Sequence, residues 1–107
     1  MINFEDFLKV DIRVGTILSA APFPEARKPA YKLVIDFGPL GQRKTSAQIT
    51  KRYTCDELIG KQVAAVVNFP TKQIANFISE CLVLGAVNEE DVALLEVENV
   101  PNGSRIA

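Results

Sequence analysis

The segment Val10-Asp11-Ile12-Arg13-Val14-Gly15-Thr16-Ile17 alternates apolar and polar residues, which is typical of a β-strand with one buried face. The alternation changes phase at Gly15-Thr16, so that Ile17 falls on the opposite parity from Val14. Such a change of phase indicates a β-bulge, and a bulge bends a long strand as a small closed barrel requires. We therefore expect a long, curved first strand.

The next part of the chain predicts a hairpin. Residues 31–38 alternate again, as do residues 43–49, and the stretch Gly38–Gln42 between them contains two glycines and a proline. A turn there would join a second strand to a third. The outer face of these two strands carries basic and hydroxyl side chains.

Two short helices are also predicted. After Asn3, the residues Phe4, Phe7 and Leu8 recur at the spacing of one helical face. The stretch Thr54-Cys55-Asp56-Glu57 fits a capping box, in which the threonine hydroxyl and the glutamate carboxylate both bind backbone amides at the start of a helix.

Apolar runs of strand length follow the second helix, at residues 63–67, 81–86 and 92–97. The order of elements is then a short helix, three strands, a short helix and two or three further strands, which is the order of an OB-fold. We predict that residues 1–107 form one all-β domain. It would be a five-stranded OB-fold barrel with a short N-terminal helix, a short helix between strands three and four, and a C-terminal extension. Other small barrels are an alternative.

Positive charge is concentrated in the middle of the chain. Nine of the twelve basic residues lie between Arg27 and Lys72, where the acidic residues are Asp36, Asp56 and Glu57, although the whole chain has a formal net charge of −1. A basic stripe favours phosphate ligands, because each neutralised phosphate releases counterions. The negative total disfavours indiscriminate nucleic-acid binding. The alternative is a solvated basic face that has no partner.

The composition argues against several classes of protein. The chain has no histidine and shows no nucleophile beside an activating base, so we expect no enzymatic activity. Cys55 and Cys81 have no second Cys or His nearby, which favours reduced thiols, and we predict neither a metal nor a cofactor. No apolar run approaches the roughly 20 residues of a membrane helix, and Met1–Asp6 lacks the basic start of a signal peptide. We expect a cytoplasmic protein that does not insert into membranes.

Four separated blocks of sequence resemble one family. The blocks are Asp11–Ile17, Pro24–Leu33, Ser46–Thr50, and Val66–Pro70 together with Ser79–Gly85. In this order and spacing they are similar to the tRNA-binding-domain family, and within it to the CsaA branch of secretion chaperones. The resemblance implies an OB-fold homodimer closed by its terminal extensions. It also implies chaperone-like peptide binding, as in the branch, and tRNA binding, as in the wider family.

The segment after Asn68 departs from the tRNA-binding pattern of that family. Relatives that bind tRNA typically carry a stretch rich in Lys and Arg, followed by Gly-x-x-Ser-x-Gly-Met. Here only Asn68, Lys72 and Ser79 keep the polar or basic character of the pattern. Gln73 stands where a basic residue is usual, and Glu80-Cys81-Leu82 replaces the final residues of the motif. Because each lost phosphate contact weakens attraction and counterion release, we expect weak RNA binding.

The same segment is more apolar than a solvated loop needs to be. Exposed apolar surface usually marks an interaction site, so we predict a groove for extended, unfolded polypeptide. The alternative is that these side chains plug the barrel end or the dimer interface. The candidate peptide-binding residues are Phe69, Ile74, Phe77 and Ile78.

The candidate tRNA-binding residues are cations and hydrogen-bonding side chains near the basic hairpin. They are Lys28, Lys32, Arg43, Lys44, Ser46, Gln48, Lys51, Arg52, Asn68, Lys72 and Ser79. Some of the cations would instead pair with carboxylates such as Asp36 or Glu57, at about 0 to 1 kcal/mol each. Asn68 has a second interpretation, in which it binds backbone groups at the end of the fourth strand. Tyr31 is expected to be buried rather than to stack on bases.

The terminal extensions, residues 1–8 and 98–107, carry apolar groups that a barrel does not need to cover. We expect them to form a homodimer interface through Phe4, Phe7, Leu8, Val100 and Ile106. The predicted function is a CsaA-like homodimeric chaperone for unfolded or exported polypeptides, including preproteins, that binds tRNA weakly and has the secretion machinery as a further candidate partner. The alternative is a dedicated, structure-specific tRNA-binding module without a chaperone role.

Overall fold

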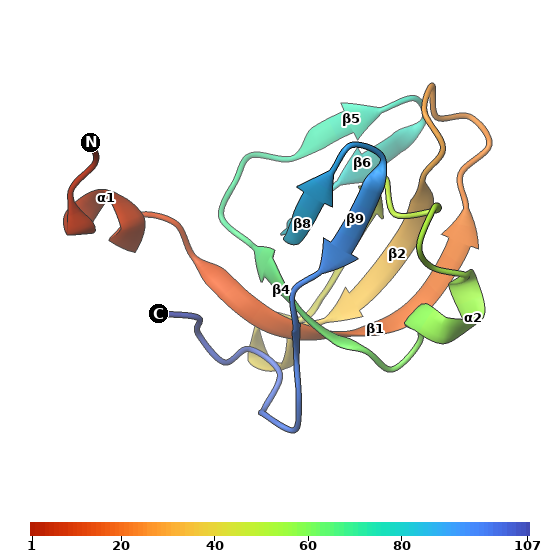
Figure 1. The fold of residues 1–107 in the computed structure, drawn as a ribbon. Helices are drawn as coiled ribbons and strands as arrows, with labels where there is room; N and C mark the ends of the chain where they lie inside the picture. The colour runs from red at the N-terminus through yellow and green to blue at the C-terminus, as the bar shows by residue number, and fades with distance from the viewer.

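The computed structural model describes residues 1–107 and consists mostly of antiparallel strands with two short α-helices (Figure 1). The helices are α1 (Phe4–Leu8) and α2 (Cys55–Leu58), and a 3-10 turn, η1 (Gly38–Leu40), joins two strands. The strands are β1 (Ile12–Pro22), β2 (Tyr31–Asp36), β3 (Gln42–Ala47), β4 (Gln62–Val66), β5 (Lys72–Ile74), β6 (Phe77–Ser79), β7 (Leu82–Val83), β8 (Gly85–Asn88), β9 (Asp91–Leu94) and β10 (Glu96–Val97). The predicted all-β class with two short helices is confirmed.

Strand β1 is the spine of the fold, because it has partners along both edges. Its residues 12–16 pair with β4, and residues 16–22 pair with β2. The C-terminal segment runs beside the part of β1 that β2 leaves free, where the amide of Val14 donates to the carbonyl of Ser104 at 2.9 Å. The C-terminal extension is therefore bound to the first strand (Figure 1).

The expected closed barrel is instead an open, curved sheet of order β10-β4-β1-β2-β3, with β7 also paired to β4. After β4 the chain turns outward into the hairpin β5–β6 and returns only as the two-residue strand β7, so no long strand pairs with β3. The gap is bridged at Lys44, whose carbonyl accepts from the Glu80 amide at 2.8 Å and whose amide donates to the Glu80 carboxylate at 2.9 Å. Residues 72–79, which we expected to be part of a loop, form this hairpin.

The change of phase in β1 has a different cause from the one that we expected. The register shift in the β1–β2 pair lies between Ile17 and Ser19, not at Gly15-Thr16. The phase changes because β1 is buried on both faces: Ile17 belongs to the main core, and Ile12 belongs to a separate cluster. Gly15 faces the main core, where an added Cβ would lie 2.5 Å from Cγ2 of Ile35. Glycine permits this close approach.

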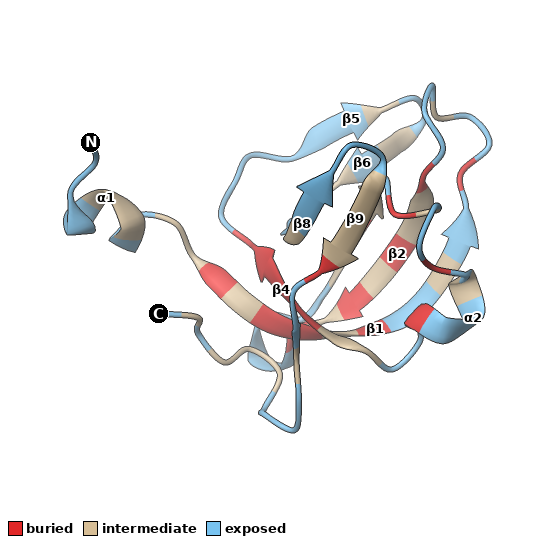
Figure 2. Cartoon of the chain, in the orientation of Figure 1, coloured by how far each residue is buried: buried red, intermediate tan, exposed pale blue.

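The main core takes side chains from the sheet, from α2 and from β9, and Figure 2 shows that buried residues of the chain lie along β1, β2 and β4. Its members are Ile17, Leu33, Ile35, Phe37, Ile49, Tyr53, Leu58, Val63, Ala65, Val67, Cys81 and Leu94. Tyr31 is half-buried and donates its hydroxyl to the carbonyl of Tyr53 at 2.8 Å. Both cysteines are free thiols. Neither α1 nor α2 has the length and apolar content that crossing a membrane would require.

Candidate functional site

A cavity of about 220 Å³ lies beside β3 and the hairpin β5–β6, and it brings together residues from both predicted ligand sets. Phe69 and Ile74 come from the peptide-binding set, whereas Ser46, Lys72 and Ser79 come from the tRNA-binding set. Pro70, Cys81 and Leu82 complete its lining, and the sequence analysis did not select these three. The two predicted sets therefore meet at one place on the surface.

The hairpin positions the cavity side chains through its register. Lys72 is opposite Ser79, and Ile74 is opposite Phe77. Because directly opposed residues in an antiparallel pair point to the same face, these four side chains share one face of the hairpin. The turn is made at Ala75, which has a positive φ of 52°. The apolar residues Ile74 and Phe77 and the polar residues Lys72 and Ser79 thus share one face of a short hairpin, which the expectation of a loop did not anticipate.

The floor of the cavity is rigid and uncharged. The hydroxyl of Thr45 donates to the carbonyl of Cys81 at 2.6 Å and lies 2.8 Å from the hydroxyl of Ser79. Burial raises the pKa of the Cys81 thiol to about 11, so this group stays protonated at neutral pH. The rim carries two apolar side chains, Phe69 and Leu82, which are both about half exposed, and the exposed cation Lys72. The cavity is suited to an apolar side chain.

Two lysines of the tRNA-binding set are held over Phe77, which does not line the cavity. The Nζ atom of Lys44 lies 5.3 Å from the centre of the Phe77 ring, and the Nζ atom of Lys32 lies 5.5 Å from it. The Phe77 ring also packs against Phe23, with 5.4 Å between ring centres. Cation–π attraction to Phe77, and for Lys32 also to Phe23 at 4.8 Å, therefore favours these positions of both ammonium groups on the outer face of β2 and β3. Phe23 was not selected from the sequence, although its position between two prolines made it an unusual loop residue.

Three other members of the tRNA-binding set bind groups within the fold. Arg52 donates from Nε and Nη2 to the two carboxylate oxygens of Asp91, at 2.9 and 2.8 Å, and this pairing holds the pKa of Asp91 below its usual range. Arg43 donates to the carbonyl of Val67. The side-chain nitrogen of Asn68 donates to the carbonyl of Lys9 at 2.7 Å, and its side-chain oxygen accepts from the backbone amide of Asp11 at 2.9 Å. Asn68 thus binds backbone groups, as the second of its two interpretations predicted, and it holds the linker between α1 and β1 in place.

The remaining members of the tRNA-binding set lie in exposed positions and do not line the cavity. They are Lys28, Gln48 and Lys51. Ile78, from the peptide-binding set, is 38% exposed and points away from the cavity face of the hairpin, because it follows Phe77 directly along β6.

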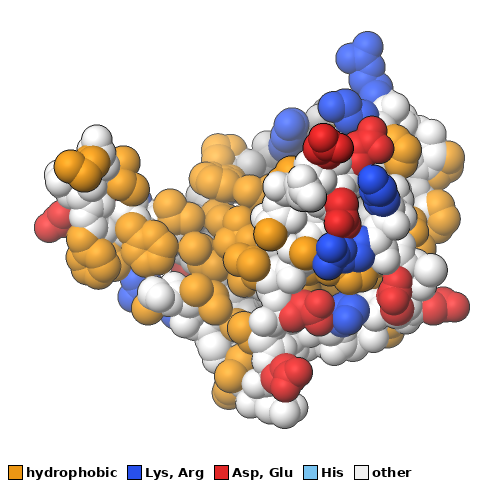
Figure 3. Space-filling model, viewed as in Figure 1, with side chains coloured by type: hydrophobic (Ala, Val, Ile, Leu, Met, Phe, Trp, Pro, Cys, Tyr) orange, Lys and Arg blue, Asp and Glu red, His pale blue; other side chains and the backbone are white.

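Apolar side chains also gather at the two chain ends. Helix α1 stands away from the sheet, and apolar side chains cover it and the neighbouring face of the molecule (Figure 3). Phe4 is 70% and Leu8 44% exposed. Phe7 and Ile106 pack on a second, smaller cluster that includes Ile12. These four residues are the part of the predicted dimer set that the fold groups at one end.

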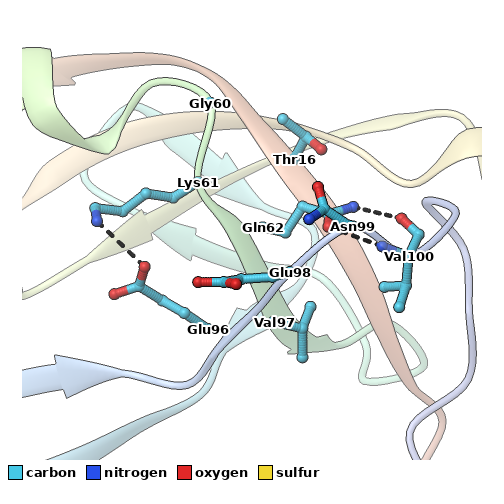
Figure 4. A pocket seen from close by; sticks show the side chains of 9 residues that line it. All are labelled: Thr16, Gly60, Lys61, Gln62, Glu96, Val97, Glu98, Asn99 and Val100. Atoms are coloured by element: carbon cyan, nitrogen blue, oxygen red, sulfur yellow. Dashed lines mark hydrogen bonds and ion pairs between the residues drawn. The ribbon is translucent and has the colours of Figure 1, made fainter.

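Val100, the fifth residue of the predicted dimer set, lines a different hollow, together with Glu96, Glu98 and Gln62 (Figure 4). The side-chain amide of Gln62 donates to the carbonyl of Val100 at 2.7 Å, and Lys61 pairs with Glu96 at 3.2 Å. This hollow is open and polar, unlike the apolar surface around α1. Val100 therefore holds the C-terminal segment against β4.

Comparison with known proteins gives a consistent set of relatives. Residues 12–105 match the family model described as "Putative tRNA binding domain". The solved structure of the chaperone CsaA from Bacillus anthracis is 56% identical, with a TM-score of 0.96, and the match covers 100% of this chain and 99% of that one. The CsaA chaperone from Picrophilus torridus is also 56% identical, with a TM-score of 0.95 and full coverage of both chains.

Longer relatives contain only a part that corresponds to this chain. The methionine–tRNA ligase of Protochlamydia amoebophila is 33% identical over 107 residues, which are 100% of this chain and 15% of the ligase. The chain therefore spans about one seventh of the length of that relative.

Proposed function

The chain belongs to the tRNA-binding domain family, and from this premise we propose that it is a homodimeric chaperone that binds unfolded or exported polypeptides and, more weakly, tRNA. The proposed role requires the cytoplasm, where tRNA and polypeptides awaiting export occur together. Contact with the secretion machinery is part of the same proposal, because exported polypeptides are the candidate clients.

The observation that carries the polypeptide role is the cavity beside β3. Its floor is uncharged, its rim is formed by half-exposed apolar side chains, and Lys72 supplies a cation at its edge. Moving apolar surface of a client from water into such a cavity gains about 25 cal/mol per Å², before ordering costs are subtracted. Because this gain depends on area and not on sequence, the cavity would accept many unfolded chains. The 56% identity to CsaA chaperones supports the same role.

The cations on β2 and β3 support the tRNA role. Lys32 and Lys44 are ordered over Phe77, and Lys72 is exposed nearby. Because Arg43, Arg52 and Asn68 bind groups within the fold, fewer side chains can contact phosphates than the candidate tRNA-binding set contains. We therefore propose an affinity that is weak and falls with salt, by roughly 0.7 logarithmic units per phosphate contact and per tenfold change in salt. A dedicated tRNA-binding module is the second candidate, favoured by the likeness to a methionine–tRNA ligase.

The apolar surface around α1 supports the dimer. A helix of five residues has little stability of its own, and Phe4 and Leu8 stay 70% and 44% exposed in the single chain. A second copy that pairs through a two-fold axis would cover the same residues on both chains. In that arrangement Asn68 sets the direction of α1, because it binds the linker that precedes β1.

Suppression of aggregation tests the polypeptide role. An unfolded substrate protein is diluted with and without the chain, and light scattering follows its aggregation. We expect the wild type to suppress aggregation and the double variant Phe69→Ser, Ile74→Ser to lose most of this effect, because both residues line the cavity. The matched control is Ile59→Ser, since Ile59 is 53% exposed and lies outside the cavity.

Each outcome of this test is informative once circular dichroism has shown that the variants fold. If the double variant protects the substrate as well as wild type does, the cavity is not the polypeptide site. A gel shift with mixed tRNA is run beside it. Strong, salt-resistant tRNA binding without any suppression of aggregation would favour the dedicated tRNA-binding module instead.

A further inference from the structure

The two proposed ligands share part of their candidate residues at the cavity. Of the eight residues around the cavity, Phe69 and Ile74 were selected for polypeptide, and Ser46, Lys72 and Ser79 for RNA. Three of the eight lining residues are therefore also candidates for contact with an RNA phosphate at this end of β3.

The neighbouring cations extend the overlap along the hairpin. Ile74 lines the cavity and is directly opposite Phe77, and the Phe77 ring carries Lys32 and Lys44. The apolar cavity and the ordered cations are thus continuous across one short strand pair. A ligand that places an apolar group in the cavity lies beside these cations, and a polyanion on the cations covers the mouth of the cavity.

We propose that each chain has a single ligand site that takes either RNA phosphates or an unfolded segment carrying an apolar side chain next to an acidic one, and never both. This inference rests on the function proposed above. The acidic neighbour follows from charge complementarity, because Lys72 lines the cavity and Lys32 and Lys44 lie over the neighbouring Phe77 ring. RNA bound to the chain would therefore keep the polypeptide site closed, and a bound client would displace RNA.

A competition experiment tests this exclusion. The probes are bulk tRNA and a fluorescein-labelled peptide of twelve residues that contains two Phe-Asp pairs. The dissociation constant of the peptide is measured by fluorescence anisotropy at increasing tRNA concentration. For one shared site, tRNA at ten times its own dissociation constant leaves about one chain in eleven free, so the apparent constant of the peptide rises about elevenfold and keeps rising in proportion.

The possible results separate the inference from the function on which it rests. A proportional rise without a plateau supports one shared site. An unchanged constant, or a rise that levels off, means that both ligands are bound together, and it overturns the inference while leaving the proposed function intact. If the peptide or tRNA fails to bind the chain alone, the proposed function fails for that ligand and the inference fails with it.

Placing a negative charge at the cavity provides a second readout. Ser46→Glu places a carboxylate inside the cavity and should weaken both ligands, whereas Ser19→Glu, at an exposed position of β1, should weaken neither. Lys72→Glu is the alternative if Ser46→Glu does not fold, because Lys72 is exposed. We expect this variant to weaken peptide and tRNA alike by about fivefold, the change that corresponds to about 1 kcal/mol for one exposed charge contact. A loss confined to one ligand would contradict a shared site.

Discussion

Replacing Phe77 by leucine should release Lys44 from its ring contact and leave Lys32 over Phe23 alone, without opening the cavity. The variant loses the aromatic pair with Phe23, worth about 0.5–1.5 kcal/mol, and two cation–π contacts, worth about 0.5–1 kcal/mol each at exposed sites. Leucine keeps part of the apolar packing, so we expect the free energy of unfolding to fall by about 1–3 kcal/mol. Urea denaturation measures this as a lower midpoint with an unchanged slope.

The same variant should bind tRNA more weakly for an entropic reason. Ordering a free lysine on binding costs about 0.5–1.5 kcal/mol, and the variant frees Lys44, whose ring contact is with Phe77, whereas Lys32 keeps its contact with Phe23. We expect the dissociation constant for tRNA to rise by about fivefold or more, while its salt dependence stays the same because the number of cations is unchanged. Ile78→Ala is the control, since Ile78 points the other way. Wild-type stability and tRNA affinity in the Phe77 variant would refute this account of the lysines.

Three further predictions follow from other parts of the fold. Light scattering should give about twice the chain mass of 11.7 kDa, and Phe4→Asp should return a folded monomer because Phe4 is mostly exposed in one chain; a wild-type monomer at micromolar concentration would contradict the dimer. Gly15→Ala should lower the free energy of unfolding by about 1–3 kcal/mol through overpacking against Ile35, and a urea midpoint equal to that of wild type would show that the core yields. Arg52 lowers the pKa of the Asp91 carboxylate, so this carboxylate should stabilise the fold above the pKa of an unfolded aspartate, about 3.9. The stabilisation is lost as the pH falls through the lower pKa of the folded state. The urea midpoints of wild type and Asp91→Asn should therefore differ at neutral pH and converge in acid.

Much of the fold could be predicted because local rules and packing agree. The capping box at Thr54 forms with both of its hydrogen bonds, and the two strands expected around η1 pair in register from Tyr31–Ala47 to Asp36–Gln42. The first strand was predicted as one curved strand, but its change of phase was misassigned. Periodicity cannot distinguish a bulge from a strand that is buried on both faces, because both interrupt the alternation of apolar residues.

The candidate site was less accessible from the sequence for two reasons. Phe23 and Phe77 are more than fifty positions apart, so their contact with each other and with the lysines depends on tertiary packing. Hydrogen bonding is the second reason, since Asn68 and Arg52 have the residue types of an RNA surface but bind groups of their own chain. A polar side chain shows its chemistry in the sequence, and only the fold shows whether a partner has already taken it.

The contact between Glu80 and Lys44 affects whether another chain can add a strand to the outer edge of β3. A strand edge with unpaired amides and carbonyls invites another strand to add to it, and such addition begins many forms of aggregation. The backbone amide and carbonyl of Lys44, in the middle of the outer edge of β3, are both occupied by Glu80. The carboxylate also adds a negative charge there. In the proposed chaperone role, this contact would let the chain hold polypeptides by their side chains without pairing with their strands at Lys44.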